Sequence, residues 1–310
     1  VHRAITFDGE PVAVKIQYPG IANTIESDLK IIEKLFSGLS KASDLLPQKH
    51  VLEIMMTEMQ DRLREEVDYQ NEADNIKWFK SNVKIPGIVI PRVIDSLSRK
   101  RVLSLEMLEG HHLTEWLATN PSQRQRNAVG QQLFDYFWYC VLELKRINAD
   151  LHPGNFLVLE NEDIGALDFG CVRDLSDLFI DHFVELIPAL IDVFENSKSP
   201  KKLLSVYQSL RVVSKDVSPE QFEQEMLGSI EPFGRWLIEA YAKEEFDFSK
   251  KQPCPGKPTD SSLKLVKQVD GFFHEQLCFD RAHLGLMNLL TEIGAVVKTD
   301  WLKYRSTESR

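Results

Sequence analysis

The sequence predicts an α+β protein of two lobes, a small mixed lobe over residues 1–109 and a mainly helical lobe over residues 110–310. Three observations support this prediction. The chain opens on a β-hairpin pattern, short β-prone runs recur near residue 100, and helical patterns dominate after residue 120. At 310 residues the chain is long enough for two lobes that share a cleft.

The small lobe is expected to begin with the hairpin. In AITFDGEPVAVKIQY, residues 4–18, Asp8 and Gly9 lie between two β-prone runs, and Val12–Ile16 is the expected second strand. Apolar residues at helical spacing then predict a helix over about residues 25–39 and a long helix over about residues 50–80.

Two short strands should complete the small lobe. The segments GIVIPRVI and RVLSLEML, residues 87–94 and 101–108, are β-prone and are expected to close it near Glu109. In the second lobe, Asn120-Pro121-Ser122 predicts the start of a helix that runs to about residue 147. The aromatic residues of that helix favour a buried core helix over a membrane or cofactor surface.

The rest of the second lobe is expected to be mostly helical. Two short strands, FLVL and IGAL, should come first, at residues 156–159 and 164–167. Helices are then expected within residues 176–245 and 262–302, with a linker or long loop rich in Pro, Gly and Ser between them.

Composition excludes several classes of protein. The net charge of −10 argues against a general nucleic-acid binder and against attraction of the whole molecule to an anionic membrane. The four cysteines are widely spaced and form no C-x-x-C, which indicates reduced thiols in a cytosol-like or matrix-like compartment. No apolar run approaches the roughly 18–20 residues that span a bilayer, so we expect no transmembrane segment. The chain opens on a strand pattern, so we also expect no signal peptide.

Lys15 is the first residue that suggests chemistry. It ends the β-prone run VAVK, and in kinase folds a lysine at such a position binds the α- and β-phosphates of ATP. It needs an acidic partner, because an unpaired cation inside a cleft is costly. On its own, a lysine at the end of a strand is more often a solvated surface residue.

An acidic stretch offers candidate partners. In REEVDYQNEAD, residues 64–74, Asp68 and Glu72 are four residues apart and would share one face of the expected long helix. Glu66 would point in a different direction from Glu72. Taken alone, this stretch favours a solvated acidic helix face.

A third constellation is the most specific. Asp150 is followed five residues later by Asn155, and Asp168-Phe169-Gly170 comes after the next two predicted strands. Phosphoryl-transfer enzymes of the protein-kinase type carry H-R-D-x-x-x-x-N followed by D-F-G. Here Asn and Ala replace the His-Arg pair. Carboxylate and amide oxygens at this spacing suit Mg²⁺.

The order of these features decides between the interpretations. A strand lysine, a helix glutamate, D-x-x-x-x-N and D-F-G follow one another as a protein-kinase-like fold requires. If the candidate residues were ordinary surface residues, all four features would have to occur in this order by chance. The sequence therefore predicts a two-lobed protein-kinase-like fold with a nucleotide site.

Several segments show a closer resemblance. VAVKIQYPG, EEVDYQNEA, ADLHPGNFL and LDFG together resemble the UbiB family, the atypical protein-kinase-like proteins also called ADCK or aarF proteins. The family includes ATPases that support coenzyme Q biosynthesis. The resemblance covers essentially the whole chain, and K-x-Q-Y-P-G and E-x-D-Y-x-x-E-A are its most specific parts, since ordinary kinases lack them.

The resemblance implies a role for each candidate residue. Lys15 would bind the nucleotide phosphates with Glu72 as its ion-pair partner, and Asp150 would be the catalytic-loop aspartate. Asn155 and Asp168 would bind Mg²⁺. The strand end Glu106, Met107 and Leu108 would be the hinge that receives adenine. Glu66 and Asp68 would be the regulatory E-x-D, which in relatives meets a preceding K-x-G-Q segment. The long stretch between Lys15 and Glu72 matches the family's inserted helices.

There are departures from the family pattern. The K-x-G-Q segment, the first strand and the Ala-rich nucleotide loop are expected before residue 1, which indicates either a chain truncated at its N-terminus or one whose nucleotide lid is missing. The family more often has Pro at the position of Leu151. DLHPGN also occurs in small-molecule kinases of the aminoglycoside-phosphotransferase type. His152 stands where protein kinases usually place a phosphate-neutralising lysine, and either a catalytic role or a local hydrogen bond would explain it.

The resemblance thus implies a Mg²⁺-dependent ATPase that binds adenine nucleotide and supports isoprenoid-quinone biosynthesis or membrane lipid handling. By resemblance, its partners would be a lipid or quinone precursor, quinone-biosynthesis proteins and, peripherally, a membrane. Two alternatives stay open: a small-molecule or protein kinase that transfers the γ-phosphate, and a non-catalytic nucleotide-sensing scaffold. Retention of the five motif residues argues against a wholly inactive site.

Overall fold

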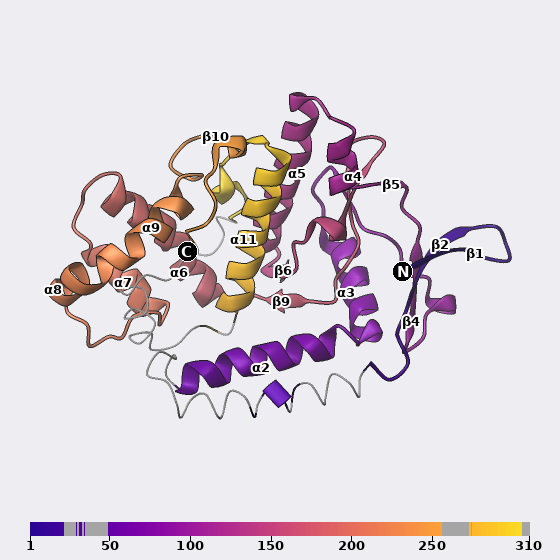
Figure 1. Cartoon of the computed structure of the whole chain (residues 1–310), viewed down its shortest axis with the longest axis horizontal. Helices are drawn as coiled ribbons and strands as arrows, with labels where there is room; N and C mark the ends of the chain where they lie inside the picture. Colours follow the sequence, from indigo (N-terminus) through magenta and orange to yellow (C-terminus); the bar gives the residue numbers. More distant parts are fainter. Residues whose placement is uncertain are drawn as a thin grey trace.

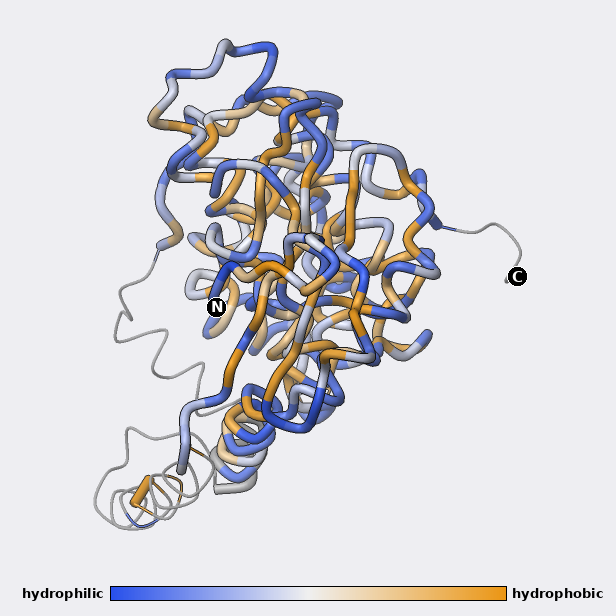
Figure 2. Tube along the Cα trace, turned by 90° about the vertical axis from the view of Figure 1, so that its right-hand side faces the viewer, coloured by the Kyte–Doolittle hydropathy of each residue, from blue (hydrophilic) through white to orange (hydrophobic). Residues whose placement is uncertain are grey.

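The computed structural model describes residues 1–21, 49–255 and 275–305, together with residues 29, 31, 32, 34 and 273. The described elements form a small β-rich part around the N-terminal strands and a larger helical part that holds the C-terminal helices (Figure 1). Hydrophobic stretches run through the body of the molecule, and hydrophilic residues follow its outer loops (Figure 2). Among the described helices, none is long and apolar enough to cross a membrane.

The N-terminal hairpin is confirmed. Strands β1 (His2–Ile5) and β2 (Pro11–Ile16) pair antiparallel, and Gly9 in their turn has a φ of +87°, which glycine adopts without strain. Strand β4 (Val102–Glu106) adds to β2 and completes a three-stranded sheet in the order β1-β2-β4. Lys15 lies opposite Leu103 in this register.

The expected long helix is in fact two helices, so that prediction is wrong. Helix α2 (Lys49–Glu65) ends, and α3 (Tyr69–Asn82) begins after Asp68. The Asp68 carboxylate accepts hydrogen bonds from the backbone N–H groups of Gln70 and Asn71, the second and third residues of α3, and caps the helix. Glu66 therefore lies in a turn, and the shared helix face expected for Asp68 and Glu72 does not exist. The helix expected over residues 25–39 falls almost wholly outside the described residues.

A second sheet has four strands, in the order β3-β8-β7-β5. Its strands are β3 (Ile88–Val89), β5 (Gly110–His112), β7 (Phe156–Leu159) and β8 (Ile164–Ala166). The two strands expected before D-F-G, FLVL and IGAL, are confirmed as β7 and β8. Strand β3 pairs in parallel with β8, which comes from the second half of the chain, and not with β4. The lobe boundary expected near Glu109 stays a prediction.

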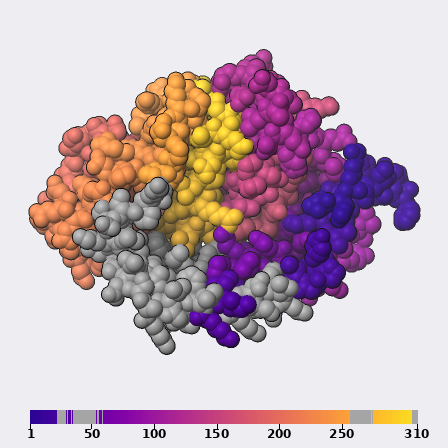
Figure 3. Space-filling model, viewed as in Figure 1, coloured from indigo at the N-terminus to yellow at the C-terminus, as the bar shows by residue number. Residues whose placement is uncertain are grey.

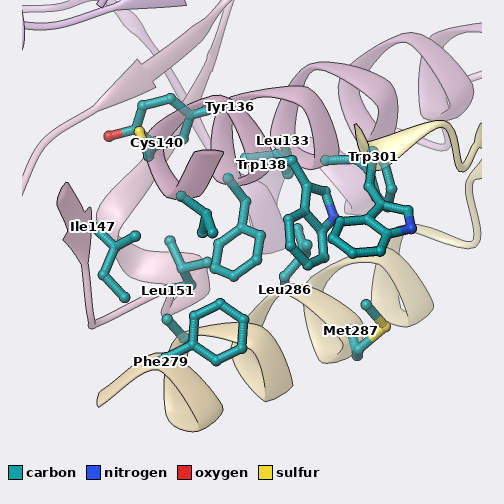
Figure 4. Packing of buried hydrophobic residues seen from close by; sticks show 14 of the residues in the cluster. Leu133, Tyr136, Trp138, Cys140, Ile147, Leu151, Phe279, Leu286, Met287 and Trp301 are labelled. Carbon is teal, nitrogen blue, oxygen red and sulfur yellow. The ribbon is translucent and has the colours of Figure 1, made fainter. Parts of the chain in front are cut away.

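The aromatic helix is α5 (Gln123–Leu142), and Ser122 caps it as expected. It ends five residues earlier than predicted, because β6 (Arg146–Asn148) pairs with β9 (Val172–Asp174). Trp138 is fully buried, and its ring centroid lies 4.6 Å from that of Trp301. Figure 4 shows these side chains packed between α5 and α11 (Gln276–Ile293). The buried-core interpretation of this helix is confirmed.

Helix α4 (Leu113–Ala118) follows β5 and packs against β5 and β7. The end of the molecule away from the N-terminal strands holds α6 (Asp177–Phe194), α7 (Lys201–Ser209), α8 (Pro219–Gln221) and α9 (Leu227–Ile238) (Figure 1). Of the helical region expected over residues 262–302, residues 262–272 lie outside the described residues, and α11 ends before residue 302 because Gly294 adopts a left-handed conformation and caps it. Strands β10 (Glu245–Asp247) and β11 (Val296–Lys298) then pair, which the sequence did not predict.

The crossing of α5 and the α11–β11 loop gives a test of packing. A methyl group added at Gly130 in α5 would lie 2.3 Å from the Cβ of Ala295. We expect Gly130→Ala to lower the free energy of unfolding by about 1–3 kcal/mol, because overpacking a core outweighs the better helix propensity of alanine. Chemical denaturation would measure the change.

Gly228 in α9 provides the matched control. A methyl group there would meet nothing within 4 Å. Gly228→Ala should stabilise the protein by up to about 1 kcal/mol. A Gly130→Ala variant as stable as Gly228→Ala would contradict the packing described for α5.

Candidate active site

Lys15 is the centre of the site. Its Nζ lies 3.0 and 2.9 Å from the two carboxylate oxygens of Glu72 on α3, and 3.1 Å from Oδ2 of Asp168. The Tyr69 ring also faces the ammonium, with its centroid 5.3 Å from Nζ. The structure therefore brings together three of the residues that the sequence selected, from three separate elements.

Burial and charge act in opposite directions on this cluster. Burial alone lowers the pKa of Lys15, but Glu72 and Asp168 together outweigh it and raise that pKa, so the amine stays charged. Burial raises the pKa of the Glu72 carboxyl, and Asp168 raises it further. Lys15 and the backbone N–H of Phe169 act against this rise. Glu72 is only 2% exposed, so its charge depends on these partners.

The Asp168-Phe169-Gly170 turn is held on several sides. The Gly170 N–H donates to Oδ1 of Asp168 at 2.9 Å, so each carboxylate oxygen has a partner. The Phe169 ring is fully buried, and its centroid lies 4.8 Å from that of Phe79 on α3. Asn75 Nδ2 donates to the Phe169 carbonyl at 3.0 Å. Helix α3 and the turn are thereby fixed to one another.

The loop of residues 149–155, the expected catalytic loop, presents Asp150 with both carboxylate oxygens bound. Asn155 Nδ2 donates to Oδ2 and to the backbone carbonyl of Asp150, each at 3.0 Å. On the other side, Arg281 Nη2 on α11 donates to Oδ1 at 2.5 Å. His152 uses Nδ1 to accept from the Gly154 N–H at 3.1 Å, which is the local hydrogen bond that the sequence left open.

Asn148 links the catalytic loop to the Asp168 turn. Its Oδ1 accepts from the Asp150 N–H at 3.0 Å, and its Nδ2 donates to the Asp168 carbonyl at 2.5 Å. Asn148 occupies the first position of the missing His-Arg pair. The substitution therefore leaves a polar side chain that connects the two motifs.

Asn155 and Asp168 offer a donor set that fits Mg²⁺. The Asn155 amide nitrogen is committed to Asp150, so its carbonyl oxygen is the atom left for a cation. The Asp168 side chain is 35% exposed and supplies carboxylate oxygens. Mg²⁺ commonly takes only one or two protein ligands and completes its shell with phosphate and water. In the described part of the chain, no group of three or more His, Cys, Asp or Glu gathers at a metal-binding spacing.

Glu106, Met107 and Leu108 lie where the hinge was expected, at the end of β4 and just before β5. The Glu106 side chain accepts from the Arg92 N–H at 3.0 Å. Leu108 lies against β8, because a methyl group added to Gly165 in that strand would be 3.1 Å from Cδ1 of Leu108. Their role with adenine stays a prediction.

Glu66 and Asp68 lie at the break between α2 and α3, one turn before Glu72, and both are exposed. Gln17 of the K-x-Q-Y-P-G segment donates to the Val67 carbonyl at 2.8 Å, so the two most specific segments meet here. A regulatory role for the E-x-D pair stays a prediction.

Sequence reasoning missed three residues of the site: Asn75, Asn148 and Arg281. The only local signal was for Asn148, because it replaces the histidine of a known motif. Asn75 sits on the same helix as Glu72 but within an ordinary polar pattern. Arg281 follows Asp150 by 131 positions, so nothing near it in sequence marks it.

Three comparisons place the chain among known proteins. A family model described as the ABC1 atypical kinase-like domain matches residues 1–200. The probable serine/threonine-protein kinase abkA of Dictyostelium discoideum is 26% identical over 269 residues, which are 81% of this chain and 46% of that protein. The mitochondrial atypical kinase COQ8B of Danio rerio is 35% identical over 194 residues, which are 61% of this chain and 30% of that protein.

The chain thus spans less than half the length of these two relatives. A solved structure of Rv3197 with erythromycin, from Mycobacterium tuberculosis, superposes with a TM-score of 0.71. It covers 97% of this chain and 73% of that one at 23% sequence identity, so the similarity concerns the fold alone. The predicted two-lobed kinase-like fold is confirmed.

The Lys15 cluster predicts a pH-dependent stability. In Lys15→Met, Glu72 loses its counter-ion, and we expect a loss of roughly 3 kcal/mol in the free energy of unfolding near pH 8. The folded state would then bind the Glu72 proton more tightly than the unfolded state, so stability rises as the pH falls. The difference in the free energy of unfolding between Lys15→Met and wild type should therefore become smaller as the pH is lowered from 8 to 5, as measured by chemical denaturation.

Lys250→Met is the matched control. Lys250 is an exposed lysine whose Nζ lies 2.8 Å from Asp247, and it lowers the pKa of that carboxyl. Loss of Lys250 should therefore cause no pH-dependent change between pH 5 and pH 8. An equal pH dependence in both variants would refute the account of Glu72.

Proposed function

The chain belongs to the ABC1 atypical kinase-like family, and from this membership we propose that it is a Mg²⁺-dependent ATPase that supports isoprenoid-quinone biosynthesis or membrane lipid handling. The observation that carries the catalytic part of the proposal is the Lys15–Glu72–Asp168 cluster. A buried ion pair between a strand lysine and a helix glutamate, next to the D-F-G aspartate, is the arrangement that phosphoryl transfer requires in kinases.

Each side chain has a defined task in this proposal. Lys15 binds the nucleotide phosphates, and Glu72 fixes its position. Mg²⁺ held by Asn155 and Asp168 would supply charge that neutralises the phosphate oxygens. Asp150 orients the attacking water. The water oxygen forms a bond to the γ-phosphorus as the bond to the bridging oxygen breaks. The electron pair leaves with ADP, and a water proton passes to Asp150 and then to phosphate.

The quinone part of the proposal rests on relatives. Two of them carry the name COQ8B, and both are described as mitochondrial. The site itself is compatible with either water or another hydroxyl as the acceptor, because Asp150 is partly exposed. Phosphate release compared with transfer to an added acceptor separates ATP hydrolysis from kinase activity.

A thermal-shift experiment with Mg-ATP tests nucleotide binding. At 100 times its dissociation constant, Mg-ATP should stabilise the wild-type protein by about 2.7 kcal/mol. Asp168→Asn should lose the part of this shift that requires Mg²⁺. Asp150→Asn should keep the shift but lose roughly 100-fold or more in phosphate release, because it removes the group that orients and deprotonates the water.

Asp192→Asn is the control for a lost carboxylate. Asp192 lies on α6 and pairs with Lys198 at 2.9 Å at the surface. This variant should match wild type in both assays. A wild-type protein with no Mg-ATP shift would contradict the proposed function, and full turnover in Asp150→Asn would contradict the role of that residue.

A further inference from the structure

Helix α11 packs directly on the catalytic loop. A methyl group added at Gly285 would lie 3.0 Å from both Cβ and the carbonyl oxygen of Leu151, so the helix backbone approaches the loop closely at that point. Arg281 lies four residues earlier and therefore on the same face of the helix. Figure 4 shows Leu151 next to α11, and in Figure 3 the yellow surface of α11 adjoins that of the segment that holds the loop.

This packing places the guanidinium of Arg281 beside the carboxylate of Asp150. Arg281 Nη2 donates to Oδ1 of Asp150 at 2.5 Å, while Asn155 holds Oδ2. The Arg281 side chain is 46% exposed, so it lies at the open edge of the site. A guanidinium has five N–H donors in a planar fork, which allows it to hold a carboxylate and an anionic oxygen together.

The catalytic loop itself provides no such cation. His152 stands two residues after Asp150, where protein kinases usually carry a lysine that neutralises the transferred phosphate. Its Nδ1 instead accepts a hydrogen bond from the Gly154 N–H, inside the loop. Arg281 is thus a cation held against Asp150 from a different element of the fold.

We propose that Arg281 is a catalytic residue that orients Asp150 and binds the oxygens of the transferred phosphoryl group in the transition state. This inference rests on the proposed phosphoryl-transfer function. As the γ-phosphorus leaves the bridging oxygen, negative charge spreads over its three equatorial oxygens, and a fixed guanidinium stabilises that charge. Arg281 forms no bond to phosphorus, and the proton of the attacking water still passes to Asp150.

The simpler alternative is a surface ion pair with no catalytic part. Such pairs contribute little to stability, typically less than about 1 kcal/mol. That alternative predicts a small change in melting temperature and no selective change in the chemical step. The two explanations therefore differ in what Arg281→Ala does to transition-state binding.

The experiment compares Arg281→Ala, Arg281→Lys and wild type. Binding of Mg-ADP and of Mg-ADP with aluminium fluoride, a mimic of the transferred phosphoryl group, would be measured by calorimetry. Arg281→Ala should bind Mg-ADP as wild type does but lose roughly 10³-fold in affinity for the aluminium fluoride complex, with a similar loss in kcat and little change in KM. Arg281→Lys should retain only part of the wild-type affinity for the aluminium fluoride complex, since lysine lacks the planar fork.

Free guanidinium ion gives a second readout. Added to Arg281→Ala at millimolar concentration, it should restore part of the lost kcat, whereas a purely structural role would not respond. Arg305→Ala is the matched control, because Arg305 is 47% exposed and pairs with Asp181 at 2.8 Å. This control should behave as wild type with and without guanidinium.

The inference and the proposed function fail in different ways. An active wild-type ATPase with unchanged or faster turnover in Arg281→Ala would overturn only the role of Arg281. Equal losses of Mg-ADP and aluminium fluoride binding in that variant would also overturn it. A wild-type protein that neither binds Mg-ADP nor hydrolyses ATP would overturn the proposed function, and with it this inference.

Discussion

The position of one ammonium group, that of Lys15, fixes the arrangement of the whole site. It links strand β2, helix α3 and the turn after β8 through Glu72 and Asp168. Glu72 is almost completely buried, and a buried carboxylate without a counter-ion is costly. The three elements must therefore meet at one point for the charges to be satisfied. Phe169 reinforces this arrangement, because its ring packs against α3 while its backbone N–H supports Glu72.

Helix α3 can place Glu72 because it begins at a defined residue. Asp68 caps it, and Gln17, the residue that follows β2, donates to the Val67 carbonyl in the turn before α3. On α2, both carboxylate oxygens of Glu65 accept from Nη1 of Arg173 in β9, at 2.7 and 2.8 Å. The α2–α3 corner is thus tied both to the N-terminal sheet and to the strand that follows D-F-G. Asp68 of the E-x-D segment therefore has a structural role, and the regulatory role of the segment stays a prediction.

The catalytic loop shows how an altered motif keeps its connections. The side-chain amide of Asn148 accepts from the Asp150 N–H and donates to the Asp168 carbonyl. The two motifs are therefore hydrogen-bonded to one another although the His-Arg pair is absent. Asn155 donates to one carboxylate oxygen of Asp150, and Arg281 donates to the other. The loop is positioned by side chains from inside it and from α11, which belongs to the C-terminal part of the chain.

The sequence by itself determined the hairpin, the capped start of α5 and the identity of Lys15 and the two metal-binding candidates. These follow from local signals: a turn glycine, strand alternation, a capping serine and fixed motif spacing. Tertiary structure decided the rest. The break before α3 needed a capping bond that competes with a continuous helical pattern, and the pairing of β3 with β8 and of β10 with β11 joins distant segments. Arg281 reaches Asp150 only because α11 packs on the catalytic loop, and no local pattern encodes a contact across 131 positions.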